Sequence, residues 1–355
     1  MSKKILFLTP YPQDTAGSQR FRFEQYYPAL IKARIDFDSR SFMDENTWDI
    51  LYRDGFLVRK AAGIFLGFLK RFWLMLWLRK YDFVFVHREA TPIGFPIIEW
   101  IIAKVWKKSL IYDFDDAIWL ENTSVENRLI SWLKYSGKVN KIISWSDKVS
   151  AGNQFLMDHA KLFNSAIVYN PTTIDTANRH VPRNKEKDQL YVGWTGTHSS
   201  LRYLEPILDM VLQLSVSLNF KLLVIADKSP EIEHNNLEFI YWNKEHEIED
   251  LNLIDIGLMP MENEEWANGK CGFKALQFMA LEKPVLVSPV GVNSEVVVDG
   301  EHGYHCRTPA EWKDRLEQLI ESIELRNSLG RNGRTKVMAE FSTESNTDSF
   351  LGLFN

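Results

Sequence analysis

The apolar positions of this chain fall into two alternating patterns. Short, mostly apolar runs typical of buried parallel strands occur at residues 4–9, 81–86, 109–112, 190–196, 221–226, 237–242 and 285–287. Segments with helical length or helical spacing lie between them, for example at residues 19–33, 273–281 and 309–323. Repeated alternation of strand and helix predicts an α/β protein built on parallel sheets.

A strand–glycine loop–helix unit occurs at the start of the chain and again near its middle. Its loop is at residues 10–18 in the first case and at residues 197–200 in the second. Such a unit opens a Rossmann-like domain, and 355 residues are enough for two domains. We expect these to span residues 1–175 and 186–335, because the charged, proline-containing segment 179–188 suits a surface linker. The first strand is not followed by G-x-G-x-x-G, so a dinucleotide cofactor is not supported.

Composition narrows the class of protein. The chain is 45% apolar and 25% charged, as globular proteins are, and its net charge of −5 argues against nucleic-acid binding. Two cysteines, Cys271 and Cys306, cannot form a disulfide framework and suit a reducing cytoplasm. The first apolar run is too short for the core of a signal peptide. These features favour a cytoplasmic protein.

The stretch from Trp266 to Asp299 concentrates candidate chemistry. A Gly/Lys-rich loop at 268–272 precedes a helix at 273–281, and a strand and a second loop follow. Helix N-termini carry unpaired N–H groups and a positive partial charge, so they bind phosphate. Lys270 and Lys274 would add full positive charges. The stretch therefore predicts an anion site.

The same stretch resembles the donor-site segment of GT-B glycosyltransferases, in particular the retaining family 4 (glycosyltransferase group 1). Residues 277–287, QFMALEKPVLV, match the second half of that segment, and 269–280, GKCGFKALQFMA, is similar to a Lys-rich subgroup. Gly269 and Gln277 stand where the family usually has two glutamates. The role of the family's first, sugar-contacting Glu therefore cannot be transferred to this chain. The resemblance covers nearly the whole chain.

This resemblance implies a GT-B fold: two Rossmann-like domains facing a cleft, with a terminal helix at 336–355 crossing back to the first domain. It implies that loops and helix starts hold a nucleotide-sugar donor, with Tyr241 a candidate for stacking on the base. The implied donor-binding residues are Gly17, Arg20, Gly196, Thr197, His198, Tyr241, Lys270, Lys274, Gln277, Gly291, Val292 and Glu295. For Gly17 and Arg20, a plain tight turn and a solvated helix residue are equally good interpretations.

Candidate catalytic residues follow two strands of the first half. His87 comes directly after a strand, where side chains face the crevice of a parallel sheet, although a lone histidine can be purely structural. Residues 113–119, DFDDAIW, resemble the Asp-x-Asp-Asp-Ala segment of the same subgroup. The carboxylates could orient an acceptor hydroxyl, cap a helix or, as the last choice, bind a metal. We select His87, Asp115 and Asp116, treat Asp113 as structural, and expect no metal because the resembling family is usually metal-independent.

The span from Arg53 to Lys80 is unusual. Residues 61–78 are almost all apolar, but Lys70 and Arg71 interrupt them, which makes a poor membrane span. The segment could be a helix buried against the sheet, which we favour as its main role. It could also contact an anionic membrane, with Lys60, Lys70, Arg71, Arg79 and Lys80 supplying charge and Trp73 and Trp77 at the boundary.

The expected function is transfer of a sugar, with retention, from a nucleotide-sugar to a saccharide or lipid-linked saccharide, in bacterial surface polysaccharide or glycoconjugate synthesis. The nucleotide-sugar is a substrate, and no cofactor is expected. In the resembling family, a donor phosphate oxygen is thought to accept the acceptor's proton. The alternative is a catalytically weak, sugar-nucleotide-binding scaffold subunit of a membrane-associated assembly, peripheral on the inner face of the membrane.

Overall fold

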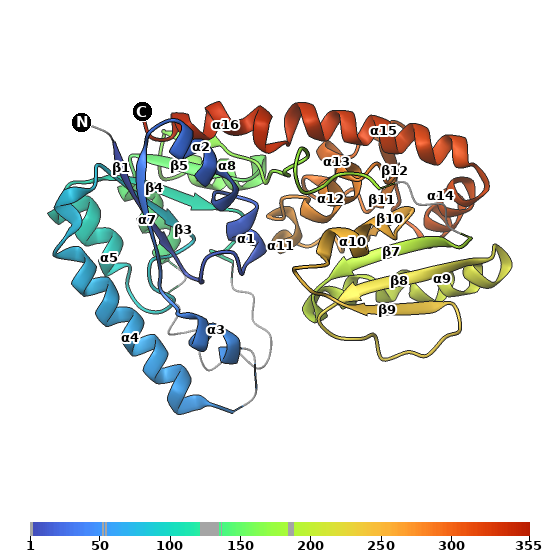
Figure 1. Cartoon of the computed structure of the whole chain (residues 1–355), viewed down its shortest axis with the longest axis horizontal. Coiled ribbons are helices and arrows are strands. Elements are labelled where there is room, and N and C mark those ends of the chain that lie inside the picture. Colours follow the sequence, from blue (N-terminus) through green and yellow to red (C-terminus); the bar gives the residue numbers. More distant parts are fainter. Residues whose placement is uncertain (1–2, 52, 54, 121–134, 136, 184–187) are drawn as a thin grey trace. The chain divides into compact units, whose positions relative to one another are not determined.

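The computed structural model describes residues 3–51, 53, 55–120, 135, 137–183 and 188–355. The chain divides into two compact units (Figure 1). Unit 1 comprises Met1–Thr172 together with Thr347–Asn355, and unit 2 comprises Thr173–Asn346. Residue 186, the expected start of the second domain, lies outside the described residues. Each unit contains one six-stranded parallel sheet.

Unit 1 has the strand order β2-β1-β3-β4-β5-β6. Its strands are β1 (Lys4–Thr9), β2 (Asp36–Ser41), β3 (Phe83–His87), β4 (Ser109–Phe114), β5 (Lys148–Ala151) and β6 (Ile167–Tyr169). Its helical segments are α1 (Gly17–Arg20), η1 (Glu24–Tyr26), α2 (Tyr27–Lys32), α3 (Glu45–Leu51), α4 (Leu57–Met75), η2 (Leu78–Lys80), α5 (Ile97–Trp100), η3 (Ile101–Val105), α7 (Lys138–Trp145) and α8 (Gln154–Lys161). The C-terminal part of α16 (Thr343–Gly352) belongs to the same unit.

Aromatic packing holds the C-terminal segment in unit 1. The ring of Phe350 stacks on that of Tyr26 with centroids 4.3 Å apart, and Phe354 packs against Phe7 and Phe85 of the sheet. The Lys148 ammonium donates hydrogen bonds to the carbonyls of Gly352 and Leu353, both at 3.0 Å. Buried aromatic area of this kind dominates core energetics, which explains why the chain end belongs to this sheet.

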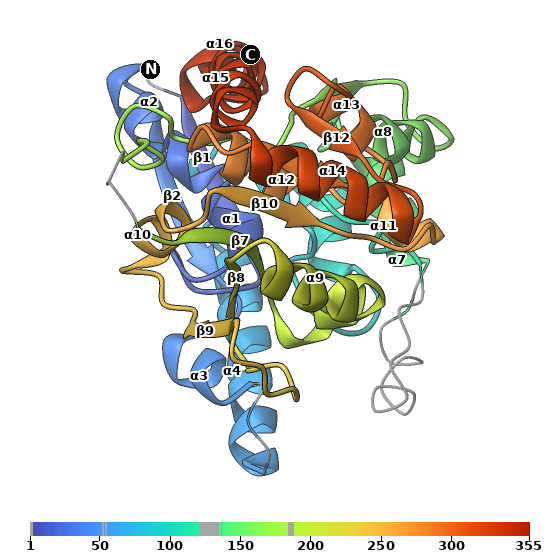
Figure 2. The same cartoon turned by 90° about the vertical axis from the view of Figure 1, so that its right-hand side faces the viewer.

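Unit 2 has the strand order β12-β11-β10-β7-β8-β9. Its strands are β7 (Leu190–Gly196), β8 (Phe220–Ala226), β9 (Leu237–Tyr241), β10 (Ile256–Met259), β11 (Val285–Val287) and β12 (Gly303–His305). Its helical segments are η6 (His198–Tyr203), α9 (Glu205–Ser217), α10 (Glu247–Asn252), α11 (Glu265–Asn268), α12 (Phe273–Ala280), α13 (Asn293–Val296), α14 (Pro309–Glu321) and α15 (Ile323–Glu340). Figure 2 shows α15 alongside α12, where Gly330 of α15 lies against the Glu282 backbone.

Most predicted strands are confirmed, but the helix expected at 19–33 is wrong. Three short segments, α1, η1 and α2, replace it. Pro28 lies in the first turn of α2, where its missing N–H is harmless, whereas it would break a continuous helix. Strand β2 was not predicted because its sequence, DFDSRS, lacks an apolar run. It pairs with the edge of β1 along its full length.

Helix α4 also differs from expectation. The preferred interpretation, a helix buried against the sheet by its apolar residues, is wrong, because most apolar side chains from Leu57 to Leu76 are exposed. Arg71, predicted to supply surface charge, is only 1% exposed. Its guanidinium donates to the carbonyls of Ala90, Arg40 and Thr9 at 2.8–2.9 Å. Arg71 therefore anchors α4 to the sheet.

In both units the sheet order reverses beside its first strand, between β1 and β3 in unit 1 and between β7 and β10 in unit 2. Loops at the carboxyl ends of such strands diverge and leave a crevice, which is where open α/β sheets bind ligands. His87 is the last residue of β3 and Arg88 follows it, and Thr197 and His198 follow β7. The fold therefore places these residues at the two switch points.

We predict that Arg71→Met lowers the free energy of unfolding of unit 1 by about 2–4 kcal/mol, because three buried carbonyls lose a charged donor. Denaturant unfolding followed by circular dichroism measures this change. Lys70→Met is the matched control. The Lys70 side chain is 54% exposed, so its replacement should change the free energy of unfolding by no more than about 0.5 kcal/mol. Equal effects of the two substitutions would contradict the anchoring role of Arg71.

Candidate functional site

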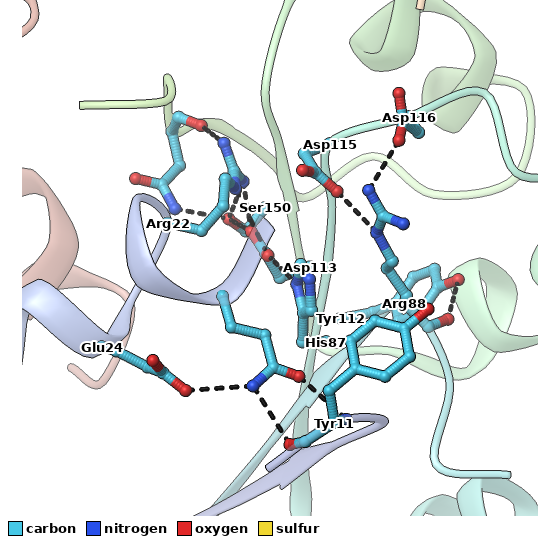
Figure 3. Close-up of polar contacts among 12 residues, drawn as sticks. Tyr11, Arg22, Glu24, His87, Arg88, Tyr112, Asp113, Asp115, Asp116 and Ser150 are labelled. Atoms are coloured by element: carbon cyan, nitrogen blue, oxygen red, sulfur yellow. Dashed lines mark hydrogen bonds and ion pairs between the residues drawn. The ribbon is translucent and has the colours of Figure 1, made fainter. Parts of the chain in front are cut away.

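A buried ion pair lies beneath the carboxyl ends of β3, β4 and β5 in unit 1 (Figure 3). The Asp113 carboxylate accepts hydrogen bonds from the Arg22 guanidinium, from Ser150 Oγ at 2.5 Å and from His87 Nδ1 at 2.7 Å. Arg22 also donates to the carbonyl of Asn170. Burial raises the pKa of Asp113, but the Arg22 charge and the His87 hydrogen bond outweigh this and hold it well below its usual value. Asp113 is thus structural, as expected.

His87 is fully buried in this network. Its ring lies 5.2 Å from that of Phe23, and its solvent exposure is zero. Since a carboxylate only accepts, Nδ1 carries the hydrogen that bonds Asp113, and Nε2 faces the interior. Within the described part of the chain, Nε2 has no hydrogen-bond partner. The structure therefore assigns His87 to the support of Asp113, and any direct contact with substrate would require its covering side chains to move.

Arg88 joins the two candidate carboxylates at the strand ends (Figure 3). Its Nε donates to Asp115 at 2.8 Å and its Nη2 donates to Asp116 at 2.6 Å. Burial raises the pKa of Asp115, but the Arg88 charge overcomes this and lowers it below its ordinary value. Both carboxylates remain 12–13% exposed.

The backbone of Arg88 is left-handed, with φ of 56°, which is uncommon for a residue with a side chain. Its carbonyl accepts a hydrogen bond from the Tyr112 hydroxyl at 2.7 Å, and its N–H donates to the Asp113 carbonyl at 2.7 Å. These bonds hold the residue in a conformation that costs energy. Such strain is commonly stored at functional sites.

The carboxylates do not form a metal site as they stand. Arg88 already neutralises Asp115 and Asp116, and no group of three or more His, Cys, Asp or Glu side chains able to hold a metal is found in the described ranges. A divalent cation would have to displace the guanidinium, which is always charged. The arrangement suits recognition of a hydroxyl better than coordination of a metal.

The loop after β1 is fixed by buried polar side chains. Gln19 exchanges hydrogen bonds with the backbone of Tyr11 and donates to Glu24 at 3.0 Å. Arg20 is only 4% exposed, so its interpretation as a solvated helix residue is wrong. Gly17 is exposed, has an ordinary φ and has open space at its missing side chain. Neither packing nor conformation demands glycine there, so close approach of a ligand is a possible use for it.

In unit 2, the Lys274 ammonium lies against the end of β7. It sits 4.4 Å from the centre of the Trp194 ring and 3.4 Å from Ser200 Oγ. A side chain at Gly196 would place its first carbon 2.6 Å from this ammonium, so only glycine permits the contact. Helix α12 and the Thr197–Ser200 loop are thereby joined through one positive charge.

Lys270 and Gly291 belong to the loops that flank the start of α12. Lys270 lies 5.2 Å from the Trp266 ring, and Gly291 takes a left-handed φ of 54° beside the Asn268 backbone. Val292 is buried next to Gly272, the N-cap of α12. The site thus combines a helix N-terminus with two lysines, which is a favourable arrangement for a phosphate.

The pKa of Lys274 is unusually low for a lysine. Burial, followed by repulsion from Lys270, lowers the pKa of its ammonium to about 7. A bound diphosphate would reverse both effects, because it supplies negative charge and hydrogen-bond acceptors. Lys274 is therefore partly neutral near pH 7 and should become fully charged when an anion binds.

Three of the other predicted donor residues lie apart from this lysine pair. The imidazole of His198 pairs with Asp227 at 2.8 Å, above the neighbouring strand. Tyr241 is 68% exposed at the end of β9, two strands away from β7. Gln277 is 2% exposed and contacts Glu247 and His180 at 3.4 Å in the interior.

Thr197 and Glu295 make local contacts. Thr197 forms the N-cap of η6, and its N–H donates a hydrogen bond to Ser200 Oγ at 3.0 Å. Glu295 is exposed on α13, and its carbonyl accepts a hydrogen bond from Lys336 at 2.6 Å. Within the predicted donor set, Lys274 adjoins Gly196, and the charge of Lys270 acts on Lys274.

Several site residues escaped the sequence analysis. Arg88, Arg22, Trp194 and Ser200 each contact a predicted residue through a side chain. Only Arg88 left a signal, since a basic residue directly after a strand is placed to meet carboxylates after the next strand. Arg22 gave none, because its partner Asp113 is 91 residues away in sequence.

Residues 231–336 match the family model described as glycosyl transferases group 1. An uncharacterized glycosyltransferase of Methanocaldococcus jannaschii is 38% identical over 65 residues, which is 18% of each chain. The capsular polysaccharide biosynthesis glycosyltransferase CapM of Staphylococcus aureus is 24% identical over 182 residues, 47% of this chain and 46% of that protein. The matches thus span less than half the length of these relatives.

Solved structures resemble the whole chain. Sucrose-phosphate synthase from Thermosynechococcus elongatus aligns with a TM-score of 0.67 at 14% identity, covering 99% of this chain and 98% of that one. Anabaena HepE in complex with UDP and glucose gives 0.66 at 14%, with the same coverage. The starch synthase IV catalytic domain from Arabidopsis thaliana, bound to ADP and acarbose, gives 0.68 at 11%, covering 100% and 99%. The α/β GT-B fold class predicted from the sequence is confirmed.

The lowered pKa of Lys274 predicts that diphosphate binding takes up a proton. Above pH 7 the free site is increasingly neutral, so affinity for UDP should fall as pH rises from 7 to 9, by up to about tenfold per unit. Titration calorimetry in buffers of different ionisation enthalpy measures the uptake. Lys274→Arg stays charged throughout and is the control, since the ligand's own titration is common to both proteins. Identical pH profiles would contradict the assignment.

Proposed function

We propose that this chain is a retaining glycosyltransferase of the Lys-rich subgroup of family 4, which transfers a sugar from a nucleotide-sugar to a hydroxyl of a saccharide or lipid-linked saccharide. The placement of Lys274 in the first turn of α12 against the Gly196 turn, with Lys270 in the loop just before the helix, carries the proposal. The match of residues 231–336 to glycosyl transferases group 1 supports it. So does the likeness to CapM, which is named for capsular polysaccharide biosynthesis. A bacterial surface polysaccharide or glycoconjugate made in the cytoplasm is the proposed product.

The second unit would hold the donor. Its diphosphate would lie at the N-terminus of α12, where Lys270, Lys274 and the loop amides near Gly196 and Gly291 meet it. When the bond from the sugar to the diphosphate breaks, negative charge develops on the leaving oxygen. Fixed positive charge in a partly buried site stabilises that state more than it stabilises the bound donor, which is what accelerates transfer.

The first unit would present the acceptor. Asp115 and Asp116, held in place by Arg88, would orient the acceptor hydroxyl by accepting its hydrogen bond, and His87 would act as a positioning residue through Asp113. The new bond forms between that hydroxyl oxygen and the sugar carbon, on the face that the diphosphate leaves. The hydroxyl proton passes to a diphosphate oxygen. This scheme needs no covalent sugar–enzyme intermediate and no cofactor.

A screen for hydrolysis of nucleotide-sugars by the purified chain tests this proposal, with released nucleoside diphosphate as the readout. We expect one donor to be consumed, and Lys270→Ala and Lys274→Ala each to weaken diphosphate binding by about 1.5–3 kcal/mol. Lys313→Ala, which removes an exposed lysine of α14, is the control and should change nothing. Unchanged affinity in a site variant would remove the phosphate role from that lysine.

The screen also separates the alternative. Gly269 stands where family 4 usually has its sugar-contacting Glu, which favours a catalytically weak scaffold subunit. Such a protein would bind nucleoside diphosphate with the same lysine dependence but would consume no donor, either alone or with added saccharide acceptors. Consumption of donor that is lost in Asp115→Asn and Asp116→Asn, with diphosphate binding intact, would favour the enzyme.

We also predict that EDTA leaves the transfer rate unchanged, because lysines rather than a metal would neutralise the diphosphate and Arg88 occupies the carboxylates. The measurement compares initial rates after dialysis against EDTA with rates after addition of Mg²⁺ or Mn²⁺. If chelation abolished activity and either ion restored it, Asp115 and Asp116 would be metal ligands, and the charge-stabilisation scheme would be wrong.

A further inference from the structure

The exposed face of α4 is the apolar one. Its most exposed side chains are Leu57, Val58, Phe65, Trp73, Leu76 and Trp77, each between 57% and 83% accessible. Leu66, Leu69 and Phe72 lie on the same side at 44–49%. A surface helix of a globular protein normally turns its apolar stripe inward and its charges outward. Helix α4 instead exposes its apolar stripe to solvent.

Packing fixes this orientation. The inner face of α4 carries Gly67, Arg71 and Met75, spaced four residues apart. A side chain at Gly67 would collide with the Phe42 ring at 2.7 Å, and Arg71 bonds three buried carbonyls. Rotating the helix to bury its apolar stripe would place bulky side chains in this contact and leave those carbonyls without their hydrogen-bond donor. The outward apolar face is therefore a property of the fold.

Further exposed apolar residues lie on α5, which packs beside α4 (Figure 1), and on η3, which directly follows α5. Ile97, Trp100 and Val105 are 39–57% exposed there. We define the α4 face as these three residues together with the exposed apolar residues of α4. An exposed apolar surface of this extent marks an interaction site.

The exposed charges that α4, η2 and η3 themselves carry are positive, whereas the nearby carboxylates belong to α3 and to Asp44, which pairs with Lys70 at 3.3 Å. Arg59, Lys70, Arg79, Lys104 and Lys107 are exposed on α4 and its neighbours. No Asp or Glu occurs from residue 55 to 81, and Glu99 of α5 is 1% exposed. The chain as a whole carries a net charge of −5, so this surface departs from the rest of the protein. Its complement is an apolar layer bordered by negative charge.

We propose that the α4 face lies in the plane of an anionic lipid bilayer. The apolar side chains would enter the boundary between headgroups and acyl chains, where Trp73, Trp77 and Trp100 are favoured, and the basic residues would meet lipid phosphates. A second copy fits less well, because two basic borders would repel each other. Within the described part of the chain, no helix has the length and apolar character of a membrane-spanning segment.

Vesicle flotation with the full chain tests the proposal. We expect the protein to float with phosphatidylcholine vesicles containing a quarter phosphatidylglycerol at low salt. It should float much less with pure phosphatidylcholine or at high salt, since screening weakens surface charge attraction. The variant Arg59→Glu/Lys70→Glu/Lys104→Glu should lose at least about tenfold in partitioning. Lys161→Glu, which alters a 52%-exposed lysine of α8, is the matched control and should float like the wild type.

A second variant separates apolar insertion from charge attraction. Trp73→Ser/Trp77→Ser keeps every charge and should still reduce flotation on anionic vesicles several-fold. Circular dichroism and thermal unfolding verify that each variant is folded. Wild type that stays in the soluble fraction on anionic vesicles at low salt would overturn the proposal. So would a dimer, detected by light scattering, that the Trp variant dissociates while no vesicle binding occurs. Flotation needs no sugar donor, so its failure would leave the proposed transfer activity untouched.

Discussion

The buried pair of Arg22 and Asp113 is the interaction on which the first unit's site depends. Asp113 is at the end of β4, Arg22 is on the segment after β1, and Ser150 and His87 add bonds from β5 and β3. A charge this far from water persists only if its partner is present and its other lone pairs are filled. The pair therefore locks four segments into one geometry. Asp115 lies two residues after Asp113 in the chain, so its position depends on the Arg22–Asp113 pair.

In the second unit, the proposed phosphate site holds positive charge in a fixed position. Lys274 is held against the Trp194 ring and the Gly196 turn, which restrict its movement without neutralising it. Its lowered pKa is the cost of that arrangement. The two units thus use charge in different ways: the first pairs Arg22 and Arg88 with carboxylates, and the second holds Lys270 and Lys274 against tryptophan rings.

Helix α4 combines a contact that stabilises the first unit with an exposed apolar surface. The same residue, Arg71, both anchors the helix and decides which side faces out, because its three carbonyl partners lie beneath it. Gly67 lets the helix pack closely against the Phe42 ring. Stability of the unit and exposure of an apolar surface therefore come from one contact. Because the contacts that stabilise the fold also keep this surface exposed, no conformational change is needed before it can bind.

The sequence alone determined the class of fold and most strands, because buried parallel strands are short apolar runs and the Gly/Pro loops between them are local signals. It also located Lys270 and Lys274, since a glycine loop before a helix is a local pattern. Tertiary structure alone decided the partners. Arg22 meets Asp113 across 91 residues, and the side of α4 that faces out depends on carbonyls at Thr9, Arg40 and Ala90. Periodicity shows that a helix has two faces, but which face is buried depends on the groups packed against it, and these are distant in sequence.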